Sequence, residues 1–151
     1  MRLSCQKAFL LLLAATIGCR DTTAPLKLPA QFELVNINGR PVPTFFSRTP
    51  GLTPTILSAS LTLDNAGMAV MTEHRREFDG TETTRTNTLV YRIKGNQIVI
   101  SCFQPPAIAS PIDLLCVSYT GTISGETLGL IVVPGSIDSS VIYNYRAAPT
   151  L

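Results

Sequence analysis

Apolar and polar residues alternate along much of the chain from residue 31 onward, and this period of two restricts the possible folds more than any other feature. Successive side chains of a β-strand point to opposite faces, so alternation marks a strand with one buried and one exposed face. In the segment 55–63, the apolar side chains on one face are Leu57, Ala59, Leu61 and Leu63. The segment 82–94 ends in the same pattern, with Leu89, Tyr91 and Ile93 on one face.

Residues that favour tight turns separate these alternating segments. Asp, Asn and Gly tolerate the positive φ that two-residue hairpin turns require. Such residues stand at Asp64-Asn65-Ala66-Gly67, Asp79-Gly80, Gly95-Asn96 and Ser124-Gly125. The sequence therefore predicts strands that are mostly joined by hairpins, at residues 31–37, 55–63, 68–78, 82–94, 97–103, 113–123, 127–133 and 140–146.

About eight antiparallel strands in sequence favour an all-β fold, either an up-and-down barrel or a strongly curled meander. Closure into a barrel removes the exposed strand edges that would otherwise pair with other chains. The apolar fraction of 45% is that of a globular protein, and no segment after residue 30 has the pattern of a useful helix. A β-sandwich is the alternative, but the long hairpins and the absence of Trp weaken an immunoglobulin-like arrangement.

The first residues have the features of an export signal. Arg2 and Lys7 precede an apolar run from Ala8 to Gly18, which has the length of a signal-peptide core. A membrane-spanning helix needs about 20 apolar residues, so a retained transmembrane segment is the weaker interpretation. We therefore assign residues 1–18 to a signal peptide, residues 19–29 to a flexible tether of charge, Thr and Pro, and residues 30–148 to the β-domain.

The junction Gly18-Cys19 resembles the processing site of bacterial lipoproteins, in which a small residue precedes a cysteine that is lipidated. The resemblance implies that Cys19 becomes the N-terminus and carries acyl chains, which anchor the protein to a membrane stably when two or more are present. The alternative is conventional cleavage, which leaves Cys19 as an ordinary thiol in a flexible tail. A reactive thiol in an oxidising compartment is a liability.

Charge excludes one class of partner. Loss of residues 1–18 removes Arg2 and Lys7, so ten basic residues balance ten acidic residues in the mature chain. No block of Lys and Arg with interleaved aromatic residues is present, and we expect no nucleic-acid partner.

Cys102 and Cys116 remain after Cys5 leaves with the signal and Cys19 is assigned to lipid. In an antiparallel hairpin centred near residue 109 these two cysteines face each other, and export makes a disulfide between them plausible. Such a bond would contribute roughly 3 kcal/mol in the chain-entropy model. Two buried free cysteines are the alternative. A zinc site would need further Cys or His ligands that the sequence does not offer here.

A second resemblance concerns the β-domain. The segments Phe32-Glu33-Leu34-Val35-Asn36-Ile37-Asn38-Gly39-Arg40-Pro41-Val42-Pro43, Gly121-Thr122-Ile123-Ser124-Gly125-Glu126-Thr127-Leu128 and Tyr143-Asn144-Tyr145-Arg146 are similar to parts of small bacterial lipoproteins with a lipocalin-like β-barrel. The resemblance implies that fold and a lipid-anchored place in the bacterial cell envelope, at the outer membrane or the periplasmic face. It carries over no catalytic residue.

The motifs of common enzymes and of metal or cofactor sites are absent from the sequence. The single histidine, His74, adjoins two arginines and is expected at an exposed strand end rather than as a catalytic base. No Gly-x-Ser-x-Gly, HExxH, CxxC, GxGxxG or phosphate-binding loop occurs. We therefore expect neither enzyme activity nor a metal or cofactor.

The expected function is non-catalytic binding of a small apolar ligand at one end of the barrel. The longest predicted connection, 38–54, contains Phe45 and Phe46, and long loops are often functional. We expect Phe45, Phe46, Tyr91 and Phe103 to line the ligand site. An alternative of equal weight is that Phe45 or Phe46 only fills the core and contacts no ligand. The alternative function is an envelope structural or protein-interaction lipoprotein without a ligand cavity, which would meet a partner through the 68–94 hairpin.

Overall fold

A computed structural model describes residues 26–45, 54–102, 117–133 and 141–149. In this part of the chain, ten strands form one sheet. Their bounds are β1 Ala30–Ile37, β2 Arg40–Pro41, β3 Thr44–Phe45, β4 Thr55–Leu63, β5 Met68–Arg76, β6 Glu82–Lys94, β7 Gln97–Cys102, β8 Ser118–Ser124, β9 Thr127–Val133 and β10 Ile142–Ala147.

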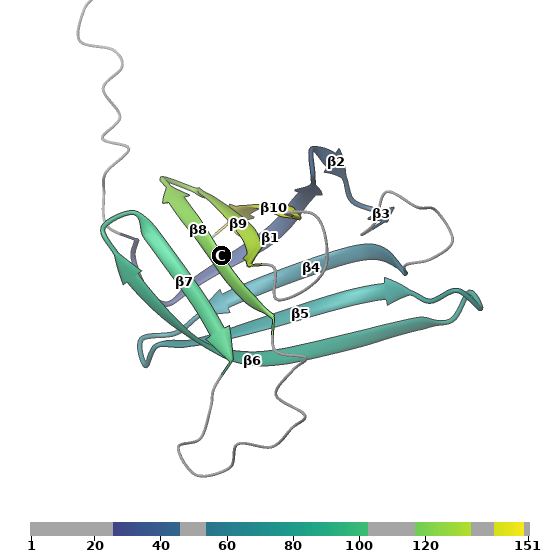
Figure 1. Ribbon diagram of the computed structural model, residues 1–151, viewed down its shortest axis with the longest axis horizontal. Helices are drawn as coiled ribbons and strands as arrows, with labels where there is room; N and C mark the ends of the chain where they lie inside the picture. The colour runs from purple at the N-terminus through teal and green to yellow at the C-terminus, as the bar shows by residue number, and fades with distance from the viewer. Residues whose placement is uncertain (1–25, 46–53, 103–116, 134–140, 150–151) are drawn as a thin grey trace, which may run out of the picture.

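The sheet closes on itself as an antiparallel up-and-down barrel, so the barrel prediction is confirmed and the sandwich is not adopted. From β4 to β10 each strand pairs with the next strand in the sequence. The first strand, β1, pairs with β10 on one side and with β4 on the other, which closes the ring (Figure 1). Because neighbours in sequence are neighbours in space, the turn residues found in the sequence can set most of the topology.

The two ends of the barrel differ in their connections. At one end, which we call the turn end, lie the tight turns after β4, β6 and β8, together with the start of β1 and the end of β10. At the other end, the loop end, lie the β5–β6 turn and the last residues of β1, β7 and β9, each of which precedes a longer connection in the sequence. Any ligand site under the long loops therefore lies opposite to the point where the chain enters the barrel.

The seam between β1 and β4 opens toward the loop end. Only the first half of β1, from Ala30 to Glu33, pairs with β4. Beyond this point β1 pairs with β2, while the start of β4 pairs with β3. The connection 38–54, which we expected to contain no elements, thus supplies two short strands along the opened seam.

Two observations correct the predicted strands in detail. A bulge in β4 between Ile56 and Ser58 turns Ile56 into the core and leaves Leu57 only half-buried, because an extra residue shifts the alternation by one. Strand β5 ends at Arg76 rather than at residue 78, and Val117 precedes β8; residues 113–116 lie outside the described part.

Part of the segment that the sequence assigned to the tether packs against the barrel. Leu26 and Leu28, which we assigned to the flexible segment 19–29, are half-buried and pack against the barrel core. Apolar burial of this kind is worth about 25 cal/mol per Å², which favours holding these leucines at the turn end. The β-domain thus begins near residue 26.

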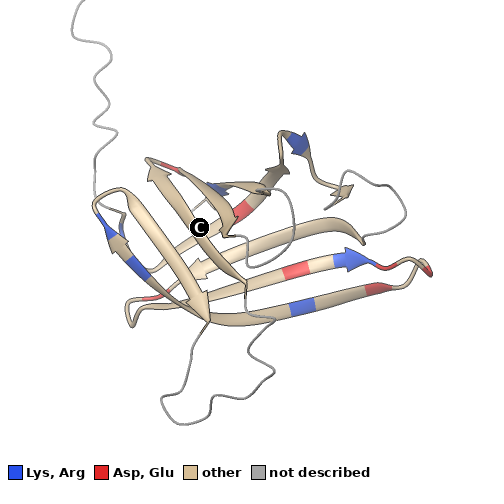
Figure 2. Ribbon diagram, in the orientation of Figure 1, with Lys and Arg blue, Asp and Glu red and all other residues tan. Residues whose placement is uncertain are grey.

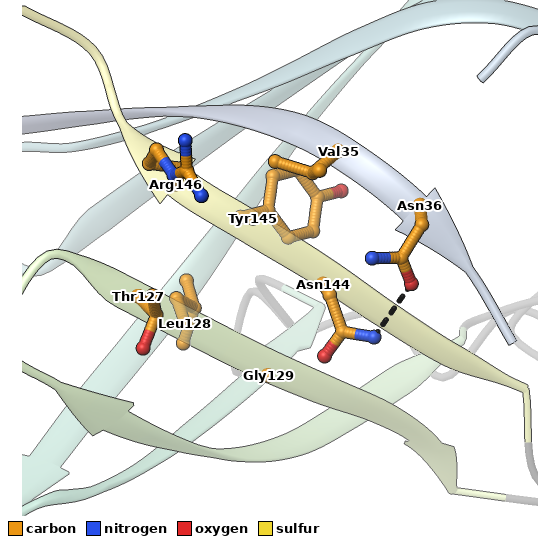
Figure 3. A pocket seen from close by; sticks show the side chains of 8 residues that line it. All are labelled: Val35, Asn36, Thr127, Leu128, Gly129, Asn144, Tyr145 and Arg146. Carbon is orange, nitrogen blue, oxygen red and sulfur yellow. Dashed lines mark hydrogen bonds between the residues drawn. The ribbon is translucent and has the colours of Figure 1, made fainter. Parts of the chain in front are cut away.

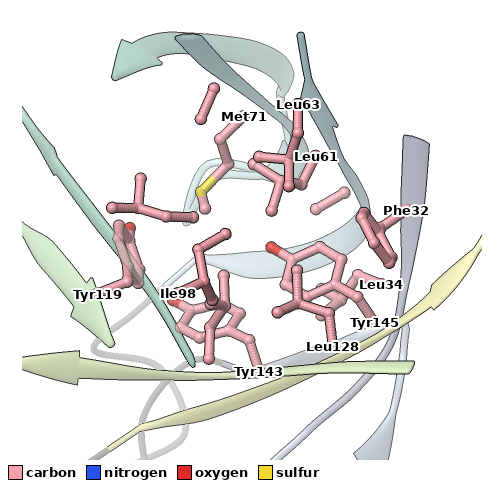
Figure 4. Close-up of a cluster of buried hydrophobic side chains, with 14 of the residues drawn as sticks. Phe32, Leu34, Leu61, Leu63, Met71, Ile98, Tyr119, Leu128, Tyr143 and Tyr145 are labelled. Atoms are coloured by element: carbon pink, nitrogen blue, oxygen red, sulfur yellow. The ribbon is translucent and has the colours of Figure 1, made fainter. Parts of the chain in front are cut away.

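Inward-facing side chains from all eight barrel strands fill the interior (Figure 4). The largest of them are fully buried, and they are Phe32, Ile37, Ile56, Leu61, Leu63, Met71, Ile98, Ile100, Leu128, Leu130, Tyr143 and Tyr145. An eight-stranded barrel has an interior that its own side chains can largely occupy. Most of this core is apolar, but its loop-end half carries polar groups.

The β5–β6 hairpin projects beyond the barrel at the loop end (Figure 1). Strand β7 pairs with β6 only from Leu89 onward, and the residues of β6 before Leu89 are exposed except Thr83. Figure 2 shows that this hairpin carries many of the charged residues, whereas β7, β8 and β9 carry none. Charge is therefore concentrated on one side of the barrel.

Candidate functional site

Of the four aromatic residues that the sequence proposed for the ligand site, the two that the structure describes, Phe45 and Tyr91, lie far apart. Phe45 lies on β3 opposite Thr55, the first residue of β4, and is 42% exposed. Tyr91 is buried at the turn end, where its hydroxyl donates to the backbone carbonyl of Asp64, just after β4. Strand β4 separates the two by roughly 25 Å at about 3.3 Å per residue. Phe46 and Phe103 lie outside the described residues.

The exposure of Phe45 also decides one alternative. Its neighbour Thr44 is buried and faces the interior, so Phe45 points the other way. Phe45 is therefore not a core plug.

The cysteines are only partly described. Cys102 ends β7 and is half-buried against the core. Cys19 and Cys116 lie outside the described residues. In the β7–β8 ladder Ile100 pairs with Tyr119, which is one position away from the register that would place Cys116 directly opposite Cys102. The disulfide stays a prediction.

A charged pair lies inside the barrel on β5. Glu73 and Arg75 share the inward face of this strand with Ala69 and Met71. Arg75 donates to Glu73 Oε2 through Nε, at 2.9 Å, and through Nη2. The side chain of Glu73 is 4% exposed and that of Arg75 is 18% exposed. A buried carboxylate needs a partner of this kind, because an unpaired buried charge is very costly.

Three tyrosines stand in the same interior (Figure 4). Tyr119 and Tyr143 meet edge to face with ring centroids 6.1 Å apart, and Tyr143 stacks beside Tyr145 at 6.4 Å. Burial raises the pKa of Tyr119 to about 12, with a smaller contribution from the charge of Glu73. Burial likewise raises the pKa of Tyr143 and Tyr145, and the charge of Glu73 adds to both shifts. All three hydroxyls thus stay protonated and can donate hydrogen bonds.

The hydroxyl of Tyr145 is buried and has no hydrogen-bond partner among the described residues. Buried polar atoms are nearly always satisfied, and each exception calls for an explanation such as a water molecule or a bound group. Leaving such a group unsatisfied costs about 1–3 kcal/mol. Tyr145 is therefore a candidate contact for a molecule that enters the barrel.

A line of polar side chains connects this interior to solvent along the inner face of the β5–β6 hairpin. Thr83 Oγ1 donates to Glu77 Oε1 at 2.8 Å, and Arg85 Nη2 lies 3.7 Å from the same oxygen. Arg85 also stands opposite Glu73 in the β5–β6 register. Acidic and basic groups balance along this face.

Sequence reasoning missed the interior pair. It offered the 68–94 hairpin, which carries Glu73 and Arg75, only as a surface for a partner. The sequence did contain a sign of this pair. Glu73 and Arg75 stand at even spacings from Ala69 and Met71, so all four side chains point to the same face of the strand. His74 lies on the outer face with its side chain 42% exposed, as the sequence predicted, and its Nε2 is 3.2 Å from Glu82 Oε2.

A hollow of about 290 Å³ lies on the outer surface across β1, β10 and β9 (Figure 3). A bulge in β1 between Leu34 and Asn36 leaves Val35 exposed beside Asn36. On β9, Gly129 has no side chain and pairs with Asn144 of β10. Val35, Asn36 and Asn144 thus surround the hollow, and its floor is the backbone at Gly129, where no side chain projects.

Two searches of the described residues give negative findings. No group of three or more His, Cys, Asp or Glu side chains there could hold a metal ion. No helix in that part of the chain is long and apolar enough to cross a membrane.

Comparisons of the chain with protein-family models, with curated proteins and with solved structures give no match.

Proposed function

We propose that this chain is an exported, lipid-anchored protein of the cell envelope that binds a small, largely apolar ligand without catalysis, at the loop end of its barrel. Cys19 would carry the anchor, and the membrane would be its partner through that anchor. The loop end is favoured because the long connections, the opened β1–β4 seam and the exposed Phe45 all lie there.

The observation that carries the proposal is the hydroxyl of Tyr145, which lies among buried aromatic rings and has no hydrogen-bond partner in the described part of the chain. A ligand with an apolar body and one hydrogen-bonding group would supply the hydrogen bond that the Tyr145 hydroxyl lacks. Pockets for small ligands are mostly apolar with a few polar groups that fix orientation.

The charges of the interior favour an uncharged ligand. Glu73 and Arg75 neutralise each other, and Glu77 faces Arg85 on the path to solvent. A charged ligand would have to break one of these pairs or remain unpaired in a buried site. A neutral ligand avoids both costs.

The fold would orient the ligand site away from the membrane. Cys19 precedes Leu26, which packs against the core near the start of β1, by only seven positions. A chain of that length spans at most about 25 Å. An anchor on Cys19 would therefore hold the turn end near the bilayer and leave the loop end facing the aqueous side.

Fluorescence titration of the mature chain carrying Cys19→Ser, without detergent, tests ligand binding. The neutral probe N-phenyl-1-naphthylamine should bind, and its sulfonated relative 1-anilinonaphthalene-8-sulfonate should bind at least about tenfold more weakly, which corresponds to about 1.4 kcal/mol. Phe45→Ala combined with Phe46→Ala should weaken binding of the neutral probe, because Phe45, although it points away from the core, lies exposed at the loop end where the probe would enter. Val99→Ala, a change of a similarly exposed residue on the outer face of β7, is the matched control.

Three results would count against the proposal. They are no binding of the neutral probe, tighter binding of the sulfonated probe, and equal effects of the Phe45/Phe46 and Val99 variants.

Cell fractionation tests the anchor. The Cys19→Ser chain should leave the membrane fraction and appear as soluble protein in the compartment to which the signal directs it. Normal processing with continued membrane association would overturn the assignment of Cys19.

A second function, contact with an envelope protein, is favoured by the projecting β5–β6 hairpin. Phe78 at its tip is 62% exposed, and Arg76 and Glu82 form an exposed ion pair beside it at 2.8 Å. Aromatic residues and arginines are enriched where proteins bind each other. Loss of a co-purified partner on Phe78→Ser, with unchanged probe binding, would support this second function.

A further inference from the structure

The outer hollow has hydrogen-bonding groups whose orientation the local structure fixes. Asn36 Oδ1 accepts from the backbone N–H of Gly39, at 3.2 Å, and from Asn144 Nδ2, at 2.8 Å (Figure 3). Because a backbone N–H can only donate, the oxygen of the Asn36 amide must point to Gly39. Its Nδ2 is then left as a donor without a partner among the described residues.

The same reasoning fixes the second amide. Asn144 uses Nδ2 to donate to Asn36, so its Oδ1 is left as an acceptor. Asn144 Oδ1 lies 3.6 Å from the point that a Cβ on Gly129 would occupy, which places this oxygen above the backbone of Gly129 in the hollow. A free donor and a free acceptor therefore stand side by side on neighbouring strands.

These groups complement a secondary amide. The carbonyl oxygen of such an amide would accept from Asn36 Nδ2, its N–H would donate to Asn144 Oδ1, and a small acyl methyl would contact the exposed Val35. The polar side chains of Thr127 and Arg146 line the rest of the hollow and can meet hydroxyl groups. The volume of about 290 Å³ is at the lower end for ligand sites and suits one sugar ring.

We propose that this outer hollow binds the acetamido group of an N-acetylated amino sugar. The proposal is independent of the ligand site inside the barrel, since the hollow lies on the opposite face of the sheet. Each hydrogen bond of this kind is worth about 0.5–1.5 kcal/mol net, so loss of one weakens binding by up to roughly tenfold.

Saturation-transfer NMR with the mature Cys19→Ser chain tests the proposal with four probes. N-acetylglucosamine should give a signal. Glucose and glucosamine, which share its ring but lack the acetamido group, should bind roughly tenfold more weakly or not at all. N-acetylglycine N-methylamide supplies secondary amides without a sugar, and it should bind more weakly than N-acetylglucosamine.

Asn36→Asp is the decisive variant. It keeps an oxygen that accepts from Gly39 and Asn144 but replaces the free donor by a second acceptor, so binding of N-acetylglucosamine should fall about tenfold with the fold retained. Gln97→Glu makes the same change in another outer hollow, beside Val99 and Thr120, and should leave binding unchanged. Gly129→Ala, whose added Cβ has only ordinary contacts, should fill the floor and also weaken binding.

Several outcomes would overturn the assignment. They are no signal from N-acetylglucosamine, equal binding of glucose, and unchanged affinity in both Asn36→Asp and Gly129→Ala. Equal binding of the peptide-like amide would show that the site recognises amides but not amino sugars. If Asn36→Asp fails to fold, the Gly129→Ala result decides.

Discussion

Glu73 and Arg75 form an ion pair inside the barrel, two residues apart on one strand, with Arg75 Nε 2.9 Å from Glu73 Oε2. Removal of one partner leaves the other charge buried and unpaired. We expect Glu73→Leu and Arg75→Met each to lower the free energy of unfolding by about 2–3 kcal/mol. Urea unfolding of both variants measures this.

The double variant is the control for that pair. Replacing both charges by apolar groups removes the unpaired charge, so the double variant should lose clearly less stability than the sum of the single losses. Additive losses would show that the two side chains act independently.

Removal of the hydroxyl should affect stability in opposite ways at Tyr145 and at Tyr91. Tyr145→Phe deletes a buried hydroxyl without a partner among the described residues, so stability should stay unchanged or rise by about 1 kcal/mol in the ligand-free protein. Tyr91→Phe deletes the hydrogen bond to Asp64 and should lower stability by about 1 kcal/mol. Thermal melts distinguish the two. A large loss in Tyr145→Phe would reveal a partner for its hydroxyl.

Alkaline pH should destabilise the protein through its tyrosines. The pKa of all four is raised in the folded state, mainly by burial, to about 12 for Tyr119. Unfolded tyrosine has a pKa of about 10, so the stability that these groups contribute is complete below pH 10 and is lost as pH rises toward 12 and above. Absorbance at 295 nm should show tyrosinate appearing together with unfolding. Gradual ionisation near pH 10 without unfolding would contradict this.

Gly121 and Gly129 should differ sharply in tolerance to alanine. A Cβ on Gly121 would stand 2.1 Å from the carbonyl oxygen of Gly129 and 2.7 Å from Leu130 Cδ2, so β8 and β9 would have to separate. We expect Gly121→Ala to cost about 2–3 kcal/mol, as overpacking does. Gly129→Ala should change stability by less than about 0.5 kcal/mol. Equal unfolding midpoints for the two variants would contradict this difference.

A disulfide between Cys102 and Cys116 remains a prediction, and two observations bear on it. Cys102 does not carry a free thiol in the structure, and Cys116 is the only other cysteine after Cys19, the proposed lipid site. Peptide mapping of the exported protein without reductant should recover the two linked peptides. Quantitative alkylation of both thiols in the folded protein would exclude the bond.

The sequence alone predicts where most strands begin and end, since alternation and turn residues act over a few neighbouring positions. It placed β6 and β9 at their observed bounds and put Leu89 and Tyr91 on the inner face. It also contained the parity that turns Glu73 and Arg75 inward. The preferences of neighbouring residues could not show that closure of the barrel would bury the face of β5 that carries Glu73 and Arg75.

The closure of β1 onto β4 and β10 could not be predicted from local sequence, because that pairing joins residues distant in sequence. The pairing of β3 with the start of β4 places Phe45 at the loop end, whereas the β6–β7 hairpin places Tyr91 at the turn end. The tertiary structure also sets the bulges at Leu57 and Val35, where one strand carries an extra residue that its partner strand does not match. The outer hollow depends on one of these bulges, so local alternation gave no sign of it.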